Sequence, residues 1–311
     1  MAKNYDFVSS DGKTLIHTQA WVPKGEKLAV VQLTHGMVEY IARYDDFAGY
    51  LTEHGYVVVG HDHLGHGETA RTPEDFGYFG DGRSDTLVKD MHTLRQRVQR
   101  DYPELPYFML GHSMGSYMLR KYLSLHAHGL SGAIVMGTGY VSNATTRMGL
   151  MLNKVITLFK GEHYRSAFMA NMSTGNGPYK QFCLDGSDPT RSWLTKDVEI
   201  AKKYYQDKYC TFVFTLNGYR GLLESVLFDN TPENVRKIDP SVPIYLVSGT
   251  EDPVGDMSKG VQTVEKMFRE AGIRDVEMRL FEGDRHEILN ETDRREVVYP
   301  TLLDWLERHR K

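Results

Sequence analysis

Short runs of apolar and β-branched residues alternate with stretches of helical period along most of this chain. When each strand is followed by a helix, the helix carries the chain back so that the next strand can lie parallel to the one before it. This alternation therefore favours a largely parallel sheet with helices on both faces. The sequence therefore predicts an α/β fold. The apolar runs lie at residues 28–36, 56–62, 105–113, 130–138, 241–249 and 276–283.

The alternation is interrupted once, between Gly139 and Asp239. The middle of this stretch is rich in Gly, Pro, Asn and Asp, which is typical of irregular structure. We therefore expect an α/β core formed by residues 1–138 and 240–311, with residues 139–239 as an insertion. One predicted helix of the insertion carries an apolar stripe, which we interpret as core packing in preference to a ligand surface. Its members are Met148, Met151, Leu152, Val155, Ile156 and Phe159.

Charge balance and cysteine content exclude several classes of protein. The formal net charge is −4, whereas binding to nucleic acid requires a basic surface, so we expect no nucleic acid partner. No stretch approaches the roughly 18 consecutive apolar residues of a membrane span, and the first residues are polar where a signal peptide is apolar. These features predict a cytoplasmic protein. Cys183 and Cys210 are too few for a disulfide framework and are interpreted as reduced thiols.

Ser113 lies in the pattern Gly111-His112-Ser113-Met114-Gly115, between an apolar run and a helical stretch. A serine on such a strand-to-helix turn presents its hydroxyl at the carboxyl edge of the sheet, and the glycines permit the crowded turn. A serine that only caps the helix is the alternative, but a cap does not require glycine on both sides. The pattern therefore predicts a nucleophilic serine.

A serine nucleophile needs a base, and the base needs an acid that orients it. In this architecture both should follow the serine, each at the end of a later strand. His286 directly follows the last apolar run and is the predicted base. Asp252 follows the preceding run and precedes Pro253, in a turn that would aim its side chain at His286, and it is the predicted acid. Glu251 and Asp256 remain as substitutes.

Attack by a serine creates an oxyanion, which backbone N–H groups can stabilise. Met114 directly follows the nucleophile, and its N–H is one expected donor. The other is the N–H of Met37, because the His35-Gly36 pair ends an earlier apolar run and Gly36 permits close approach. We expect His35 to brace this turn by hydrogen bonding.

The segment 61–69 holds three histidines and two acidic residues, which raises the question of a metal site. Its glycines, Gly65 and Gly67, indicate a tight loop in place of converging ligands. We therefore interpret Asp62 and the histidines as hydrogen-bonding groups that fix this loop. The chain has neither a phosphate-binding loop with its lysine nor a dinucleotide fingerprint, so we expect no cofactor and no metal.

Five motifs together resemble the α/β-hydrolase fold, and in particular bacterial serine hydrolases similar to monoacylglycerol lipase and lysophospholipase. The resemblance implies Ser113 as nucleophile, Asp252 as acid and His286 as base, with Met37 and Met114 as oxyanion donors. It also implies that residues 139–239 are a cap (lid) over the active site. The motifs lie at residues 35–51, 58–69, 110–116, 248–255 and 283–291.

The expected function is that of a carboxylic ester hydrolase that works through an acyl-serine intermediate. Monoacylglycerols, lysophospholipids and short-chain esters are the expected substrates, because an apolar cap suits an acyl chain. Hydrolysis of amides or thioesters, and acyl transfer by the same fold, remain the enzymatic alternatives. A binding protein without turnover is the alternative from another class, and contact between the cap and a membrane surface is left open.

Overall fold

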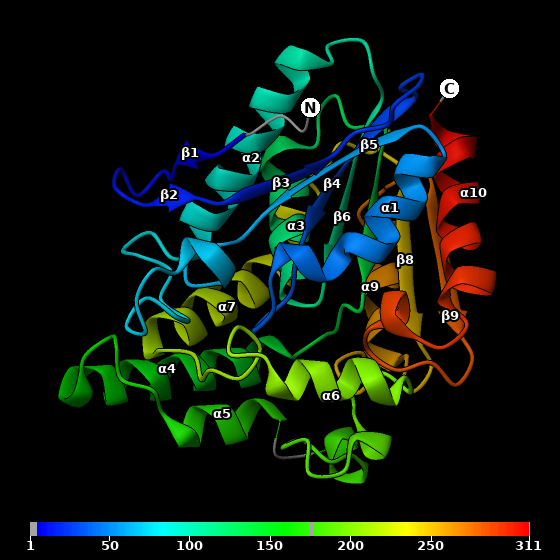
Figure 1. The fold of residues 1–311 in the computed structure, drawn as a ribbon. Helices are drawn as coiled ribbons and strands as arrows, with labels where there is room; N and C mark the ends of the chain where they lie inside the picture. The colour runs from blue at the N-terminus through cyan, green and yellow to red at the C-terminus, as the bar shows by residue number, and fades with distance from the viewer. Residues whose placement is uncertain (1–4, 175–176, 311) are drawn as a thin grey trace.

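The computed structural model describes residues 5–174 and 177–310, and its centre is a seven-stranded sheet. The strand order is β3-β5-β4-β6-β7-β8-β9, and within the sheet β3 alone pairs antiparallel. The prediction of a mostly parallel α/β sheet is confirmed (Figure 1). The strands are β3 (Thr18–Trp21), β4 (Ala29–Thr34), β5 (Tyr56–His61), β6 (Tyr107–His112), β7 (Gly132–Met136), β8 (Ile244–Gly249) and β9 (Val276–Phe281), and a separate antiparallel pair is formed by β1 (Phe7–Val8) and β2 (Leu15–Ile16).

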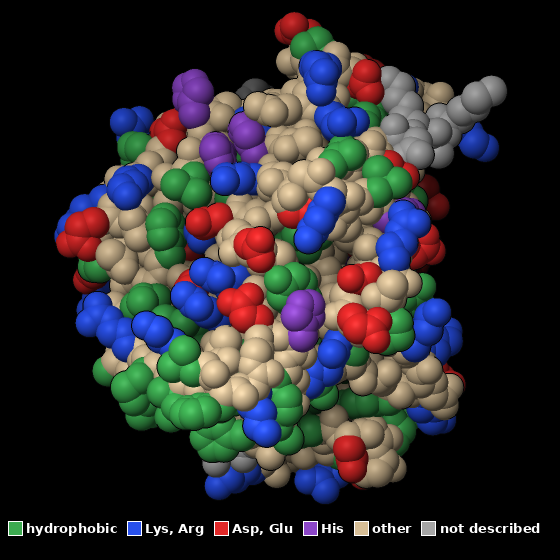
Figure 2. Space-filling model, turned by 90° about the vertical axis from the view of Figure 1, so that its left-hand side faces the viewer, with side chains coloured by type: hydrophobic (Ala, Val, Ile, Leu, Met, Phe, Trp, Pro, Cys, Tyr) green, Lys and Arg blue, Asp and Glu red, His purple; other side chains and the backbone are tan. Residues whose placement is uncertain are grey.

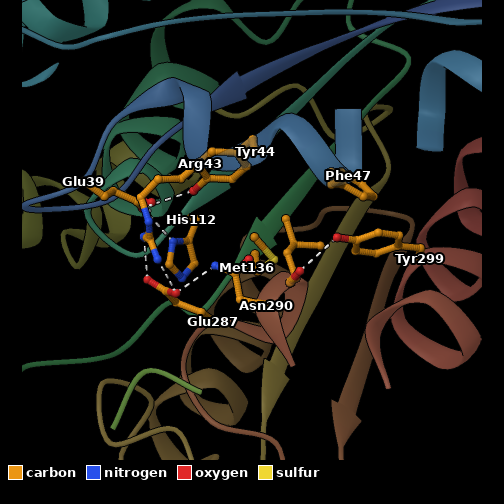
Figure 3. Close-up of a pocket in the computed structure, with 10 residues that line it drawn as sticks. Glu39, Arg43, Tyr44, Phe47, His112, Met136, Glu287, Asn290 and Tyr299 are labelled. Atoms are coloured by element: carbon orange, nitrogen blue, oxygen red, sulfur yellow. Dashed lines mark hydrogen bonds and ion pairs between the residues drawn. The ribbon is translucent and has the colours of Figure 1, made fainter. Parts of the chain in front are cut away.

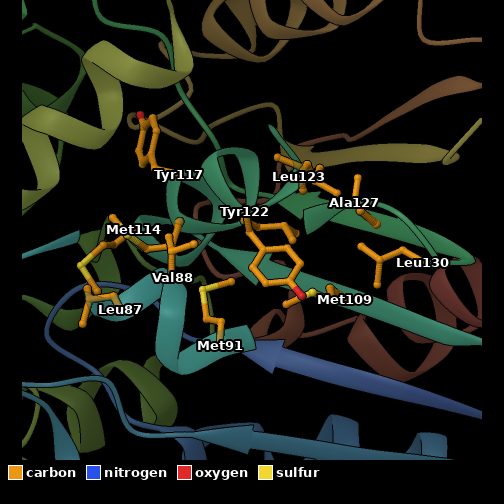
Figure 4. Close-up of a cluster of buried hydrophobic side chains, with 14 of the residues drawn as sticks. Leu87, Val88, Met91, Met109, Met114, Tyr117, Tyr122, Leu123, Ala127 and Leu130 are labelled. Carbon is orange, nitrogen blue, oxygen red and sulfur yellow. The ribbon is translucent and has the colours of Figure 1, made fainter. Parts of the chain in front are cut away.

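Helices cover both faces of the sheet because its central strands are apolar on both sides. In β4, for example, Val30 packs into one buried cluster and Val31 into the other. Figure 4 shows part of the first cluster, where Tyr122 of α3 meets Met91 of α2. The helices on that face are α2 (Ser84–Asp101), α3 (Met114–His126) and α9 (Lys259–Glu270), and those on the other are α1 (Asp45–Glu53) and α10 (Tyr299–His309).

The stretch between β7 and β8 folds largely as helices beyond one end of the sheet (Figure 1). The longest of them, α4, packs against α7, and α7 in turn packs against α3. The insertion is thereby attached to the helix that follows Ser113. Its helices are α4 (Asn143–Lys160), α5 (Ala167–Thr174), α6 (Val198–Gln206), α7 (Leu216–Asp229) and α8 (Pro232–Val235).

The interpretation of the α4 stripe as core packing is wrong for Met148, Met151, Val155 and Phe159, which are exposed, and right for Ile156, which packs against the main buried cluster. The side of α4 that faces α7 carries the small residue Gly149 next to Leu223, and Asn153, which donates a hydrogen bond to the Leu216 carbonyl. Gly149 allows the two helices close contact, and most of the larger apolar side chains turn outward. Met151 is 60% exposed and Phe159 is 83% exposed. Over the residues described, no helix has the length and apolar character needed to cross a bilayer.

Candidate active site

Ser113 lies on a sharp turn between β6 and α3, with a backbone φ of 52°. A positive φ is unfavourable for a residue other than glycine and marks strain at this turn. The flanking glycines are required by space, since a Cβ on Gly111 would lie 2.4 Å from the Gly115 oxygen, and one on Gly115 would lie 2.1 Å from the Thr34 oxygen. The Ser113 side chain makes no capping hydrogen bond to α3, so its hydroxyl is not used as a helix cap.

Asp252 and His286 are brought together at the carboxyl ends of β8 and β9. The Asp252 Oδ1 and His286 Nδ1 atoms are 2.9 Å apart, and both side chains are buried. The Ser248 hydroxyl and the Val254 N–H also donate to the carboxylate. Burial by itself would raise the pKa of Asp252, but His286 and these hydrogen bonds outweigh it and lower the pKa. Asp252 is therefore held as a carboxylate that orients the imidazole.

The two substitutes for Asp252 point elsewhere. Glu251 is exposed and lies 3.8 Å from Arg285 in an ion pair. Asp256 is exposed and has a positive φ of 49° in the turn before α9. Neither contributes a hydrogen bond to His286 among the described residues.

The loop after β4 lies directly beside Ser113, because a Cβ on Gly36 would come within 3.0 Å of the Ser113 Cβ. In this loop the Gly36 N–H donates to Glu39 and the Val38 N–H donates to His66. The N–H groups of Met37 and Met114 meet no acceptor among residues 5–174 and 177–310. Two donors near Ser113 thus remain available to a ligand oxygen.

His35 braces this turn as expected. Its Nδ1 lies 2.8 Å from the Gly36 carbonyl, and its Nε2 accepts the His63 N–H. A ring that donates at Nδ1 and accepts at Nε2 is neutral, with its tautomer fixed by its partners. Asp62 fixes the same region by accepting the N–H groups of Ile41 and Glu68.

The prediction for the other histidines of segment 61–69 is only partly right. His66 bonds to the loop after β4, but the ring nitrogens of His61 and His63 meet no partner in the described part of the chain. Burial lowers the pKa of His61 to about 3, so this ring stays neutral. Across the described part of the chain, one group of side chains lies close enough together to hold a metal ion, formed by Asp275, Glu277 and His309. It includes no histidine of segment 61–69.

A buried network of charged residues, missed by sequence reasoning, surrounds His112, the residue before Ser113 (Figure 3). Arg43 donates two hydrogen bonds of 2.7 Å to Glu287 and a third of 3.0 Å to Glu39. Glu39 also accepts from Gly36 and lies 3.0 Å from His112 Nδ1. The available signal was the position of Glu287 directly after His286, together with the four-residue spacing of Glu39 and Arg43.

His112 carries a positive charge in this network. Its Nδ1 faces the Glu39 carboxylate, and its Nε2 lies 3.2 Å from the His286 carbonyl oxygen. Because both partners are acceptors, both ring nitrogens must be donors, which makes the ring an imidazolium. Burial lowers the pKa of His112, but Glu39 and then Glu287 outweigh burial and raise it. Two cations, His112 and Arg43, then balance two carboxylates.

This charge assignment predicts a stability that depends on pH. The pKa of His112 is raised above the roughly 6.5 of an unfolded histidine, so its contribution is fully present below about pH 6.5 and is lost as pH rises through the folded pKa. We expect the stability difference between wild type and His112→Gln to shrink between pH 6 and pH 9 in urea unfolding. His128→Gln, whose side chain is 98% exposed, is the control and should show no such change. A difference that is constant with pH would contradict the charged state.

Most of this chain matches the model of one protein family. A family model described as "Serine aminopeptidase, S33" matches residues 25–293. The chain belongs to this family. It is therefore a hydrolase, and the resemblance drawn from the five motifs is confirmed at the level of fold and family.

Relatives of this S33 family member include named esterases and lipases. A crystal structure of a carboxyl esterase from Bacillus coagulans, in complex with glycerol, is 29% identical and superposes with a TM-score of 0.90 over 100% of this chain and 99% of that one. The monoglyceride lipase of Homo sapiens is 25% identical over 90% of this chain and 82% of its own length. A monoglyceride lipase homolog of Monkeypox virus is 24% identical over 94% of both chains. These similarities place the chain among α/β-hydrolases.

Proposed function

We propose that the protein is a serine-dependent carboxylic ester hydrolase with Ser113 as nucleophile, His286 as base and Asp252 as acid. The observation that carries the proposal is the buried Asp252–His286 pair, 2.9 Å apart, at the same sheet edge as the strained turn of Ser113. The Nε2 atom of His286 is buried and has no partner among the described residues, so it is available to accept a proton.

The reaction follows from these positions. His286 Nε2 takes the proton of the Ser113 hydroxyl while Oγ attacks the ester carbonyl carbon, and the N–H groups of Met37 and Met114 stabilise the oxyanion. The bond from carbon to the alcohol oxygen then breaks, and His286 returns its proton to the leaving alcohol. Water, deprotonated by His286, attacks the acyl carbon of the acyl-serine; the bond from carbon to Oγ then breaks, His286 gives its proton to Oγ, and the acid leaves. Asp252 stays ionised and stabilises the imidazolium at each step.

Residues 139–239 serve as a cap that supplies an apolar acyl pocket. Tyr40, in the loop after β4, donates a 2.8 Å hydrogen bond to Asp207 and so ties that loop to the insertion. Met37 and two residues of the insertion, Met172 and Phe212, pack as partly buried side chains against the main buried cluster. Apolar side chains of this kind suit the acyl chains of monoacylglycerols, lysophospholipids and short-chain esters. The names of the lipase and esterase relatives support the same substrate class.

Ester hydrolysis is favoured over removal of amino-terminal residues, although the family description names an aminopeptidase. An aminopeptidase needs carboxylates free to bind the substrate ammonium. In the insertion, Glu162 accepts from Asn217, while Asp185 and Asp188 accept from neighbours two residues further along the chain. These carboxylates are occupied in local structure.

The exposed side of α4 supports contact of the cap with a lipid surface. Figure 2 shows hydrophobic side chains along the lower edge of this face, at the level of α4 and α5 in Figure 1, with Lys and Arg side chains beside them. Leu158 is 75% and Phe159 is 83% exposed, and Lys154 and Lys160 are exposed on the same helix. Apolar side chains flanked by lysines favour an anionic lipid surface.

We expect Leu158→Ser combined with Phe159→Ser to weaken binding to phosphatidylglycerol vesicles roughly tenfold or more, from the apolar area no longer buried. Co-sedimentation with vesicles measures this effect. Hydrolysis of a water-soluble p-nitrophenyl ester should be unchanged, because neither residue lies at Ser113. Leu125→Ser, on α3 and 48% exposed, is the matched control. Equal vesicle binding by all three proteins would contradict the role of α4.

We propose the cytoplasm as the place of action. Cys183 and Cys210 are both unpaired, and free thiols are typical of a reducing compartment. Expression with and without an export signal, followed by mass spectrometry of the thiols, tests this location.

A fluorophosphonate probe tests the proposed chemistry most directly. We expect labelling of the wild type and none of Ser113→Ala. Labelling that survives in Ser113→Ala, or its absence from the wild type, would overturn the serine mechanism. A series of p-nitrophenyl esters of increasing chain length, beside monoacylglycerol and lysophosphatidylcholine, then defines the acyl and head groups. No turnover of any of them would favour amide or thioester cleavage or acyl transfer.

A further inference from the structure

The indole of Trp193, a residue of the insertion, lies against the imidazole of His286. The ring centroids are 5.0 Å apart and the planes differ by 26°, which is a stacked arrangement. Tyr179, also from the insertion, packs edge-on against the indole with centroids 5.6 Å apart. One aromatic side chain of the proposed cap is thus placed directly on the proposed base.

Backbone hydrogen bonds join the segment that carries Trp193 to the loop that carries His286. The His286 N–H donates to the Trp193 carbonyl, and the Glu287 N–H donates to the Leu194 carbonyl at 2.7 Å. Leu194 is buried, as are two other residues of the segment 192–196. The backbone of this part of the insertion is therefore fixed to the loop of His286, which keeps Trp193 beside the imidazole.

We propose that Trp193 is a positioning residue for His286, which keeps the ring in place and stabilises the imidazolium formed when His286 takes the proton of Ser113. The inference rests on the proposed function, because it assigns His286 the role of base. The face of an indole attracts a cation more strongly than the other aromatic rings do. Because the proposed mechanism places a proton on His286 as Ser113 is deprotonated, the attraction is stronger in the transition state than before the proton is transferred, which is the condition for a faster reaction.

The charges around His286 favour stabilisation of its imidazolium by an uncharged side chain. Asp252 stabilises the imidazolium at Nδ1. His112, with its ring 4.7 Å from that of His286, opposes a second positive charge because it is itself an imidazolium. Trp193 stabilises the cation without adding a charge that the network would have to balance. The titratable and charged groups packed around the ring and its loop are Asp252, His112, Glu39, Arg43, Arg285, Glu287, Tyr117 and Tyr179.

The test compares Trp193→Phe and Trp193→Leu with the wild type over a pH range. Removing an interaction that favours the protonated ring makes its protonation less favourable, so the acid limb of kcat/KM for a p-nitrophenyl ester should move to lower pH. We expect a shift of roughly half to one pH unit for Trp193→Leu, a smaller one for Trp193→Phe, and a plateau roughly three- to tenfold lower for Trp193→Leu. A purely structural role would lower the plateau and leave the limb in place.

Trp21→Leu is the matched control, since Trp21 bonds to Asp45 and not to His286, and it should leave the limb unmoved. Limbs that coincide in wild type and both Trp193 variants would overturn the inference. Should Trp193→Leu not fold, Trp193→Phe carries the test, because its expected shift has the same direction. Failure of the proposed function looks different, since the wild type would then show no fluorophosphonate labelling at any pH.

Discussion

Replacing Asp252 with alanine should lower kcat by about four orders of magnitude, a loss comparable to that for the acid of other serine hydrolases. The carboxylate fixes the His286 tautomer at 2.9 Å and stabilises the imidazolium from a buried position. Without it, Nδ1 has no partner to hold its proton. Turnover of a p-nitrophenyl ester at saturating substrate measures the loss, and a thermal unfolding scan shows that the variant is folded at the assay temperature.

The kcat of Asp252→Asn should be at least tenfold higher than that of Asp252→Ala, for a reason that is specific to this site. The oxygen that faces His286 also accepts the Val254 N–H, whereas the other oxygen accepts the Ser248 hydroxyl. The asparagine oxygen can keep the first place while its amide donates to Ser248, whose hydroxyl can turn to accept. The His286 tautomer is then preserved, and only the charge is lost.

The control for this pair is Asp256→Asn, which should stay within a few-fold of wild type because Asp256 is exposed. A loss in Asp256→Asn as large as that in Asp252→Ala would show that the acid has been assigned to the wrong residue. Equal losses of kcat in Asp252→Asn and Asp252→Ala would show that the contribution of Asp252 comes from its charge alone. They would also show that Ser248 does not keep the asparagine oxygen facing His286.

The strands could be predicted from the sequence because each is a short apolar run with a clear end. Parallel strands bring their carboxyl ends to one edge, so the approach of Asp252 to His286 follows from topology and needs no side-chain detail. The direction in which α4 turns its apolar side could not be predicted. That direction depends on Gly149 and Asn153 facing α7, which are contacts between elements distant in the chain.

The charged network and Trp193 were beyond sequence reasoning for a related reason. Glu39 and Arg43 have the spacing of an ordinary surface ion pair, and only tertiary packing shows that Glu287 completes it in a buried place. Trp193 lies in an irregular stretch of the insertion, where no periodicity indicates which side chain reaches the sheet. The sequence thus indicated the residues of the proposed active site, whereas the side chains packed around them could be identified only from the fold.

Arg43→Met should lower the free energy of unfolding by about 3 to 5 kcal/mol, because it leaves two buried carboxylates with too little positive charge. For a chain of this size the loss corresponds to roughly 5 to 8 °C in Tm. The matched control is Arg308→Met, since Arg308 also makes two hydrogen bonds, of 2.9 Å, to one carboxylate but is 48% exposed. Exposed pairs contribute about 1 kcal/mol or less.

The loss in Arg43→Met should also depend on pH. Arg43 helps to lower the pKa of Glu39 and of Glu287, so its contribution is present above the roughly 4.3 of an unfolded glutamate and is lost as pH falls through the folded values. The free energies of unfolding of wild type and variant, measured in urea, should therefore differ most near pH 7. The difference should shrink as pH falls below about 4. Adding Glu287→Gln to Arg43→Met removes one unpaired charge and should recover part of the stability at pH 7. If the double variant is no more stable than Arg43→Met, the loss comes from packing of the arginine and not from uncompensated charge.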